Sequence, residues 1–405
     1  MSRMIELIQG GGVTSPRGFL AGGTYAGIKT AEDGAMDLAI LVSEQPASVG
    51  GVFTKNKVVS PSVILSRERV SKDRLRGVVV NSGCANCSVG SQGLSDAEEM
   101  TSLAAKHIGC DIEDVLVCST GMIGVELPMA LVRQNMGNIS CAVGGGNDFA
   151  KAIMTTDTHP KEMALSLDTS GCKIMLGGAA KGAAMLHPNM ATMLSFITTD
   201  ANVESQFLQS SLEEAVAASF NMIDVDGDTS TNDTVLVFAN GLSGGQRIDS
   251  ESADATRFKE ALTYICTGLA KELVRDGEGS QRLIEVVVKG AVTVEEARWA
   301  AREIASSVLV KAMVHGRDPN WGRIMVALGK SGVDFEESKV DLYINDIHIV
   351  HNGTSFPYLK DAVISAMNVP EIRFRIDLNC GDSSGTAWGC DLTEDYVTLN
   401  SAYST

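Results

Sequence analysis

The residues around Ala191 and Thr192 are the ones whose types and order suit a chemical reaction. A Pro-Asn pair at residues 188–189 precedes the threonine, and the β-rich run 194–198 follows it. A threonine hydroxyl is a weak nucleophile because it is protonated at neutral pH, but a free α-amine on the same residue, with a pKa of about 8, can act as its base. Cleavage before Thr192 creates that amine. From residue type alone, an ordinary threonine at the start of a strand fits better.

Other motifs in the chain do not support a bound metal or nucleotide. Counted from Asp224, positions six and twelve of a calcium loop hold Thr229 and Val235 in place of Gly and Glu, so we expect these carboxylates to hold a turn. Cys84 and Cys87 form a lone Cys-x-x-Cys without the second pair of ligands that structural zinc requires. Walker and Gly-x-Gly-x-x-Gly sequences are absent. We therefore expect no metal and no resident cofactor.

The elements that must position Thr192 alternate short β-rich runs with amphipathic helices, without the strict repetition of a doubly wound sheet. We expect strands at residues 77–81, 115–118 and 283–288. Capping boxes at residues 95–98 and 293–296 predict two helix starts. An apolar stripe from Phe258 to Leu273 predicts a helix packed on the core. The pattern favours a mixed α/β or α+β fold with a soft domain boundary near residue 285.

Composition limits the partners and the compartment. The 405 residues are enough for one large core or roughly two to three ordinary ones. A net charge of −17 repels nucleic acid and anionic membranes, so we expect neither as a partner. The first six residues lack the apolar core of a signal peptide, and the nine scattered cysteines are typical of reduced thiols. We therefore expect a cytoplasmic protein.

Blocks of sequence along almost the whole chain resemble the ornithine acetyltransferase family (glutamate N-acetyltransferase, bifunctional arginine biosynthesis protein). The segment 181–194 resembles the cleavage-site motif of that family. Many long blocks in the family's order make a chance match implausible. The other matching blocks are residues 11–19, 51–56, 81–86, 118–124, 154–158, 226–233, 316–323 and 387–392, together with the tail through Asn400 and Thr405.

This resemblance implies an N-terminal-nucleophile-like fold of the ornithine acetyltransferase type, with mixed sheets and packed helices. It implies self-cleavage between Ala191 and Thr192, giving an α chain of residues 1–191 and a β chain of residues 192–405. Residues 192–285 would complete the catalytic domain with the α chain, and residues 286–405 would form a C-terminal α/β domain. Two α and two β chains would associate.

The resemblance also implies the reaction. Thr192 would take the acetyl group of N-acetylornithine as an ester and pass it to glutamate, in a ping-pong scheme. Whether acetyl-CoA is a second donor stays open. Thr120 and Gly121 would form the oxyanion hole, Lys181 would meet a substrate carboxylate, and Glu278 the δ-ammonium of ornithine. The substrate contacts carried over are Thr155 (or its neighbour Thr156), Lys181, Thr192, Glu278, Asn400 and Thr405.

Four positions depart from the family pattern. Cys84 stands where a small polar residue is usual, and Ala184 where the cleavage loop usually has glycine. Arginines usual near acidic substrates are missing at Met222 and beside Cys380, which leaves the acceptor open. Two other hypotheses therefore remain: an amidase or aminopeptidase using the same threonine, and a non-catalytic binding protein.

Overall fold

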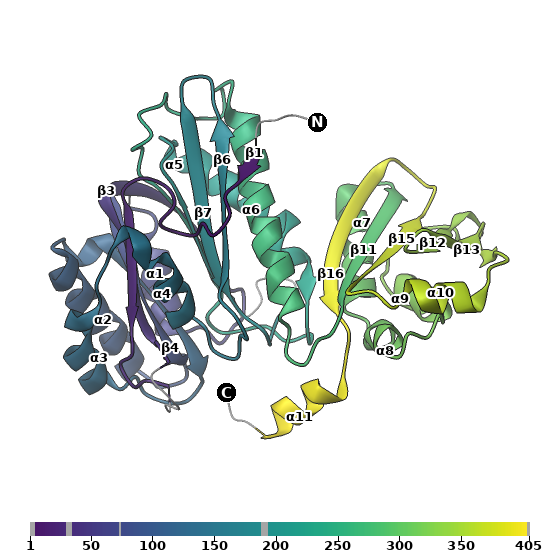
Figure 1. Cartoon of the computed structure of the whole chain (residues 1–405), viewed down its shortest axis with the longest axis horizontal. Coiled ribbons are helices and arrows are strands. Elements are labelled where there is room, and N and C mark those ends of the chain that lie inside the picture. The colour runs from purple at the N-terminus through teal and green to yellow at the C-terminus, as the bar shows by residue number, and fades with distance from the viewer. Residues whose placement is uncertain (1–4, 30–34, 73, 188–192, 403–405) are drawn as a thin grey trace.

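The computed structural model describes residues 5–29, 35–72, 74–187 and 193–402. Ala191, Thr192 and Thr405 lie outside these ranges, so the predictions made for them are not addressed by the structure. The described strands form two sheets with both parallel and antiparallel neighbours, and helices pack on them (Figure 1). The predicted mixed α/β class with packed helices is confirmed.

The first sheet bends back on itself at one long strand, β3 (Leu38–Phe53). The first part of β3 pairs with β2 and β4, and its last part pairs with β10, so the sheet makes two layers. An apolar cluster that includes Leu41, Phe149 and Phe196 fills the space between the layers. The strand order is β1-β6-β7-β8-β10-β3-β4-β5 with β2 beside β3. The other bounds are β1 Ile5–Leu7, β2 Phe19–Thr24, β4 Leu75–Cys84, β5 Val115–Met122, β6 Lys161–Asp168, β7 Lys173–Lys181, β8 Leu194–Thr199 and β10 Thr234–Ala239.

Helices cover the outer faces of both layers of this sheet. The long helix α6 packs on β6 and β7 and places Phe258, Ile265 and Leu273 in the core, as the apolar stripe predicted. On the other outer face, α1 and α2 pack on β5. The helices are α1 Pro61–Arg69, α2 Gln92–Ile108, α3 Met129–Asn135, α4 Gly146–Ala152, α5 Ser205–Ala218 and α6 Ala255–Arg275, with short 3₁₀ turns at Ile112–Asp114, Met136–Asn138, Val143–Gly145 and Phe220–Met222.

The second sheet, of order β14-β13-β12-β15-β11-β16-β9, carries the C-terminal part of the chain. The helix α7 covers it, and the last helix, α11, leads back towards the first sheet (Figure 1). The bounds are β9 Ile223–Asp224, β11 Leu283–Ala291, β12 Asp341–Ile344, β13 Ile347–His351, β14 Thr354–Ser355, β15 Glu371–Asp377 and β16 Ser383–Cys390, with α7 Val294–Ala305, α8 Val308–Gly316, α9 Gly322–Gly329, α10 Lys360–Ala366, α11 Glu394–Ala402 and a 3₁₀ turn at Glu337–Lys339.

Of the two predicted capping boxes, one is confirmed and one is wrong. The Thr293 side chain accepts from the Glu296 N–H and the Glu296 side chain returns the bond at the start of α7. In contrast, α2 begins at Gln92, so residue 95 lies inside the helix. A tertiary contact explains the earlier start, because the side-chain amide of Asn86 donates to the Gly93 carbonyl at 2.8 Å and holds the first turn.

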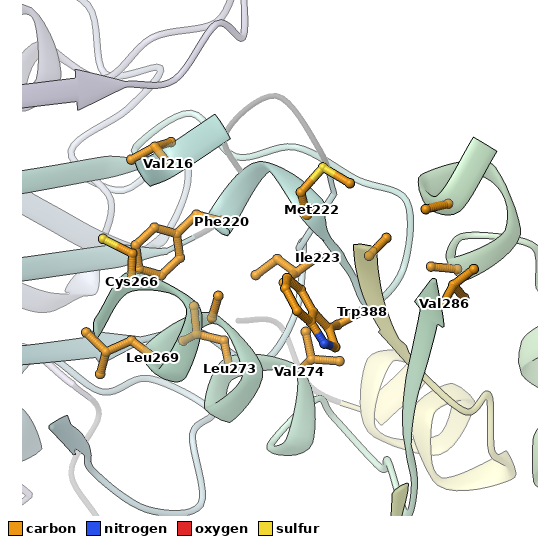
Figure 2. Packing of buried hydrophobic residues seen from close by; sticks show 14 of the residues in the cluster. Val216, Phe220, Met222, Ile223, Cys266, Leu269, Leu273, Val274, Val286 and Trp388 are labelled. Atoms are coloured by element: carbon orange, nitrogen blue, oxygen red, sulfur yellow. The ribbon is translucent and has the colours of Figure 1, made fainter. Parts of the chain in front are cut away.

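One continuous apolar core joins the two sheets. Figure 2 shows Phe220, Met222 and Ile223 beside Leu273 and Trp388, between α6 and β16. Each of these five side chains is buried. The two sheets therefore share packing, which ties the C-terminal region to the layers that carry the candidate site.

Two expectations from composition can be compared with the described residues. All nine cysteines are free thiols, and five of them are buried. None of the described helices combines the length and the apolar character needed to cross a bilayer.

Candidate active site

Three adjacent strands bring the predicted residues to the start of β8. Lys181, the last residue of β7, pairs with Leu194, the first residue of β8. Thr234, the first residue of β10, pairs with Leu194 from the other side. The chain therefore leaves the Ala191–Thr192 junction and enters β8 between Lys181 and Thr234. The predicted β-rich run after the threonine is confirmed as β8, whose residues are all buried.

A polar cleft of about 480 Å³ lies at this point. It collects residues from segments far apart in the sequence, and five of those predicted as oxyanion or substrate residues line it. Both members of the ambiguous pair at 155 and 156 face it, so the structure does not separate them. The cleft is lined by Ala85, Thr120, Gly121, Ile123, Thr155, Thr156, Lys181, Ala183, Ala184, Met185, Ser230, Thr231, Asn232 and Glu278.

Lys181 is the buried cation of this cleft, with only 2% of its surface exposed. Its Nζ donates to Thr155 Oγ1 at 2.8 Å and to Thr120 Oγ1 at 3.3 Å. Because each hydroxyl accepts from the ammonium, its own proton is available to a group in the cleft. Burial lowers the pKa of Lys181, and the negative charge of Asp157 opposes that change. The lysine thus orients two hydroxyl donors.

Gly121 occupies a backbone position that requires glycine. Its φ is +128°, and a Cβ there would come within 2.3 Å of the Gly83 carbonyl carbon on the neighbouring strand β4. The close approach and the positive φ are open only to glycine without strain. Thr120 and Gly121 therefore present a hydroxyl and a backbone amide next to each other on the cleft wall, two donors of the kind that stabilise a tetrahedral oxyanion.

Asp157 organises the cleft from beneath, and sequence reasoning did not single it out. Its carboxylate accepts from the Thr155 N–H at 3.0 Å and the Gly182 N–H at 2.7 Å. It also pairs with the fully buried Lys161 at 2.5 Å. Burial alone would raise the pKa of Asp157, but the charges of Lys181 and Lys161 outweigh it and lower the pKa to about 2. A fixed negative charge thus sits behind the two segments that carry the lining residues.

Glu278 lines the opposite side, in the turn after α6. Its carboxylate accepts from the side-chain amide of Asn400 at 2.8 Å, which brings α11 to the cleft. The turn is tied to the rest of the site because Lys161 also pairs with Asp276 at 2.6 Å. The predicted pair of Glu278 and Asn400 is therefore brought together, from positions 122 residues apart.

Carboxylate and amide side chains hold the loops that flank the junction. Asp226 accepts from the Met185 N–H at 2.6 Å and the Leu186 N–H at 3.1 Å, which confirms that this acidic segment holds backbone rather than calcium. Burial raises the pKa of Asp226 to about 6. Asn232 donates to the carbonyls of Ala85 and Ser119, both at 2.7 Å, and so fixes the strand end that leads to Thr120.

The positions that depart from the family pattern fall in different places. Ala184 lines the cleft, and Cys84 lines a neighbouring hollow. Met222 is 2% exposed in the core of Figure 2, and Cys380 lies between β15 and β16 with its thiol donating to the Leu378 carbonyl. Neither Met222 nor Cys380 lines the cleft, so the structure does not support an effect of these two on the acceptor.

One group of side chains in the described residues has ligand atoms close enough for a metal, although the sequence predicted no metal site. The ligand atoms of Asp341, His348 and His351 lie within 4.8 Å of one another on the hairpin of β12 and β13. Hydrogen bonds explain part of this geometry: His351 Nδ1 lies 2.9 Å from the Asp341 carboxylate, and its other ring nitrogen 3.2 Å from the amide of Asn352. None of these residues lines the cleft.

The layered mixed fold and the polar cleft together define a small-molecule enzyme of the α/β class. A family model described as the ArgJ family matches residues 20–405. The chain therefore belongs to the ArgJ family.

Curated relatives agree over the full length. A protein named arginine biosynthesis bifunctional protein ArgJ from Dehalococcoides mccartyi is 45% identical over 405 residues, which is 100% of both chains. One of the same name from Symbiobacterium thermophilum is 49% identical over 397 residues, 98% of this chain and 99% of its own. The crystal structure of the protein of that name from Bacillus halodurans matches with a TM-score of 0.52 and 41% identity, over 52% of this chain and 100% of that one.

Proposed function

We propose that this protein is a self-cleaving acetyltransferase of arginine biosynthesis that moves the acetyl group of N2-acetyl-L-ornithine to L-glutamate through an acetyl-Thr192 ester. The observation that carries the proposal is the gathering of Thr120, Gly121, Lys181 and Glu278 around one cleft at the strand that follows Thr192. The names of the relatives support the pathway.

The reaction has two acyl transfers. In the first, Thr192 Oγ attacks the acetyl carbonyl while its α-amine takes the hydroxyl proton, and ornithine leaves as an amine. In the second, the amine of glutamate attacks the ester and Thr192 is released. Each step passes through an oxyanion, which the Thr120 hydroxyl and the Gly121 N–H stabilise by roughly 3 kcal/mol per donor.

The charges of the cleft suit the two substrates. Glu278 matches the δ-ammonium that ornithine carries, and Lys181 matches a carboxylate common to both amino acids. Asn400, bonded to Glu278, makes α11 part of the substrate site. We place Thr405 at the same site, since α11 ends three residues before it.

A second donor, acetyl-CoA, is part of the proposal. A hollow next to the cleft shares Gly121, Thr155 and Thr156 with it and is lined further out by apolar side chains and Lys29. A donor longer than acetylornithine therefore has space beside the same oxyanion residues. We propose, in addition, that the products 1–191 and 192–405 stay together as two α and two β chains in the cytoplasm.

The test is an assay of purified protein with acetyl-labelled donors. The proposal expects labelled N-acetylglutamate from N-acetylornithine and a labelled Thr192 when glutamate is withheld. Release of free acetate in the presence of glutamate would instead identify an amidase or aminopeptidase on the same scaffold. Binding of acetylornithine without turnover would identify a non-catalytic protein.

A further inference from the structure

We propose that Asp233 is the proton-transferring residue of the self-cleavage step, and this assignment rests on the self-cleavage proposed above. Asp233 is absent from the residues that the family resemblance assigns. It precedes β10 and is fully buried, with an exposed fraction of 0%.

The geometry of Asp233 fixes it next to the junction. Its Oδ1 accepts from the backbone N–H of Met193 at 3.0 Å. The nitrogens of Met193 and Thr192 are joined through three bonds of about 1.46, 1.52 and 1.33 Å, so they are less than about 4 Å apart in any conformation. The carboxyl group is therefore anchored one peptide unit from the nitrogen that cleavage releases.

The other oxygen of the same carboxyl is free to act. Asp233 Oδ2 is buried and has no hydrogen-bond partner among the described residues. The backbone on both sides is held, because the Thr234 N–H donates to the Met193 carbonyl at 3.1 Å and the Thr54 N–H donates to the Asp233 carbonyl at 2.9 Å. A buried polar atom of this kind calls for a partner or a role.

Self-cleavage supplies that role because it moves one proton. Thr192 Oγ attacks the carbonyl carbon of Ala191, the bond from that carbon to the Thr192 nitrogen breaks, and an Ala191–Thr192 ester forms. The departing nitrogen must gain a proton and the hydroxyl must lose one. A neutral Asp233 gives its proton to the nitrogen and recovers one from the hydroxyl, so no outside acid is used. Water then hydrolyses the ester and leaves the free α-amine.

The protonation state required is the one its surroundings favour. Burial raises the pKa of Asp233 well above the ordinary range of a carboxyl, while the Lys181 charge across β8 opposes this. The carboxyl is thus neutral when the chain folds. Asn232, its neighbour, fixes the strand end at Ser119 and Thr120, so the proton donor and the oxyanion donors are held by consecutive residues.

The experiment compares wild type with Asp233→Asn, Asp233→Glu and Asp200→Asn by denaturing gel and intact mass. Asp200 is the matched control: it is 1% exposed and accepts from the Met175 N–H at 2.8 Å, but it lies at the far end of β8. Asn at 233 keeps an acceptor for Met193 and loses the transferable proton. We expect cleavage of Asp233→Asn to be roughly 100- to 10,000-fold slower, with wild-type cleavage in Asp200→Asn.

The pH profile separates proton transfer from a structural role. Cleavage of purified Asp233→Glu precursor should fall as pH rises above the pKa of the new carboxyl, whereas residual cleavage of Asp233→Asn should lack this fall. Cleavage of Asp233→Asn at the wild-type rate would overturn the assignment while leaving the proposed function intact. If Asp233→Asn does not fold, a folded Asp233→Glu chain that cleaves without the alkaline fall would overturn it as well. A wild-type chain that stays whole would refute the proposed function itself.

Discussion

Replacing Asp157 by Asn should remove a charge on which the stability of the whole cleft depends. The carboxylate is fully buried as a side chain and lies 2.5 Å from Lys161, which is buried to the same extent. A fall in its pKa from 3.8 to about 2 corresponds to roughly 2 kcal/mol of folding free energy, at about 1.4 kcal/mol for each unit of pKa. Leaving Lys161 without this partner adds to the cost, so we expect a loss of about 2–4 kcal/mol in Asp157→Asn.

The pH dependence follows from the sign of that pKa change. A carboxyl whose pKa is lowered by folding contributes its stability above the unfolded pKa of about 4, and this contribution is lost as pH falls through about 2. The difference in unfolding free energy between wild type and Asp157→Asn should therefore be constant from pH 7 to about 5 and shrink below about 4.

Urea unfolding at fixed protein concentration, followed by circular dichroism, measures this difference. A double-mutant cycle with Lys161→Met isolates the pair, and we expect a coupling energy of at least about 1 kcal/mol. A coupling below about 0.5 kcal/mol, or a difference that does not shrink at low pH, would refute the reasoning. Activity should fall together with stability, because Asp157 also accepts from the Thr155 and Gly182 amides.

Three further variants test other parts of the site. Gly121→Ala places a Cβ 2.3 Å from Gly83 at a φ of +128°, so kcat/KM should fall at least about 100-fold, as for loss of one oxyanion donor; an active variant would remove Gly121 from that role. Glu278→Gln keeps the bond to Asn400 but loses the charge, so KM for acetylornithine should rise about 10-fold or more with little change in melting temperature; an unchanged KM would contradict the charge match. Met222→Ala should cost about 2–4 kcal/mol of stability, measured by urea unfolding, and leave KM for glutamate unchanged, since the side chain is in the core; a raised KM would return Met222 to the acceptor site.

Much of the scaffold could be predicted from sequence because its signals are local. The stripe from Phe258 to Leu273 and the capping box at Thr293 each act within one helix, and both were found where predicted. The start of α2 was not, because the side chain of Asn86 lies outside the helix it extends. The residues forming the strand ends at Thr120 and Lys181 could be named from the family resemblance, but their meeting at one ammonium depends on sheet pairing.

The buried carboxylates behind the cleft show the limit of sequence reasoning. Asp157, Asp233 and Asp226 look like ordinary loop residues in the sequence, and charged side chains are usually exposed. Their roles depend on which backbone amides and lysines the fold places within 3 Å of them. The Asp-rich block 226–233 was the available signal, since three acidic residues there flank a segment that lines the cleft.

The measurement that tests the central claim most directly is the mass and N-terminal sequence of the purified protein after incubation with N-acetylornithine alone. The account predicts two chains, residues 1–191 and 192–405, and one acetyl group on the side chain of Thr192 in the second chain. A single chain of 405 residues that still forms N-acetylglutamate, or an acetyl group found on another residue, would contradict it.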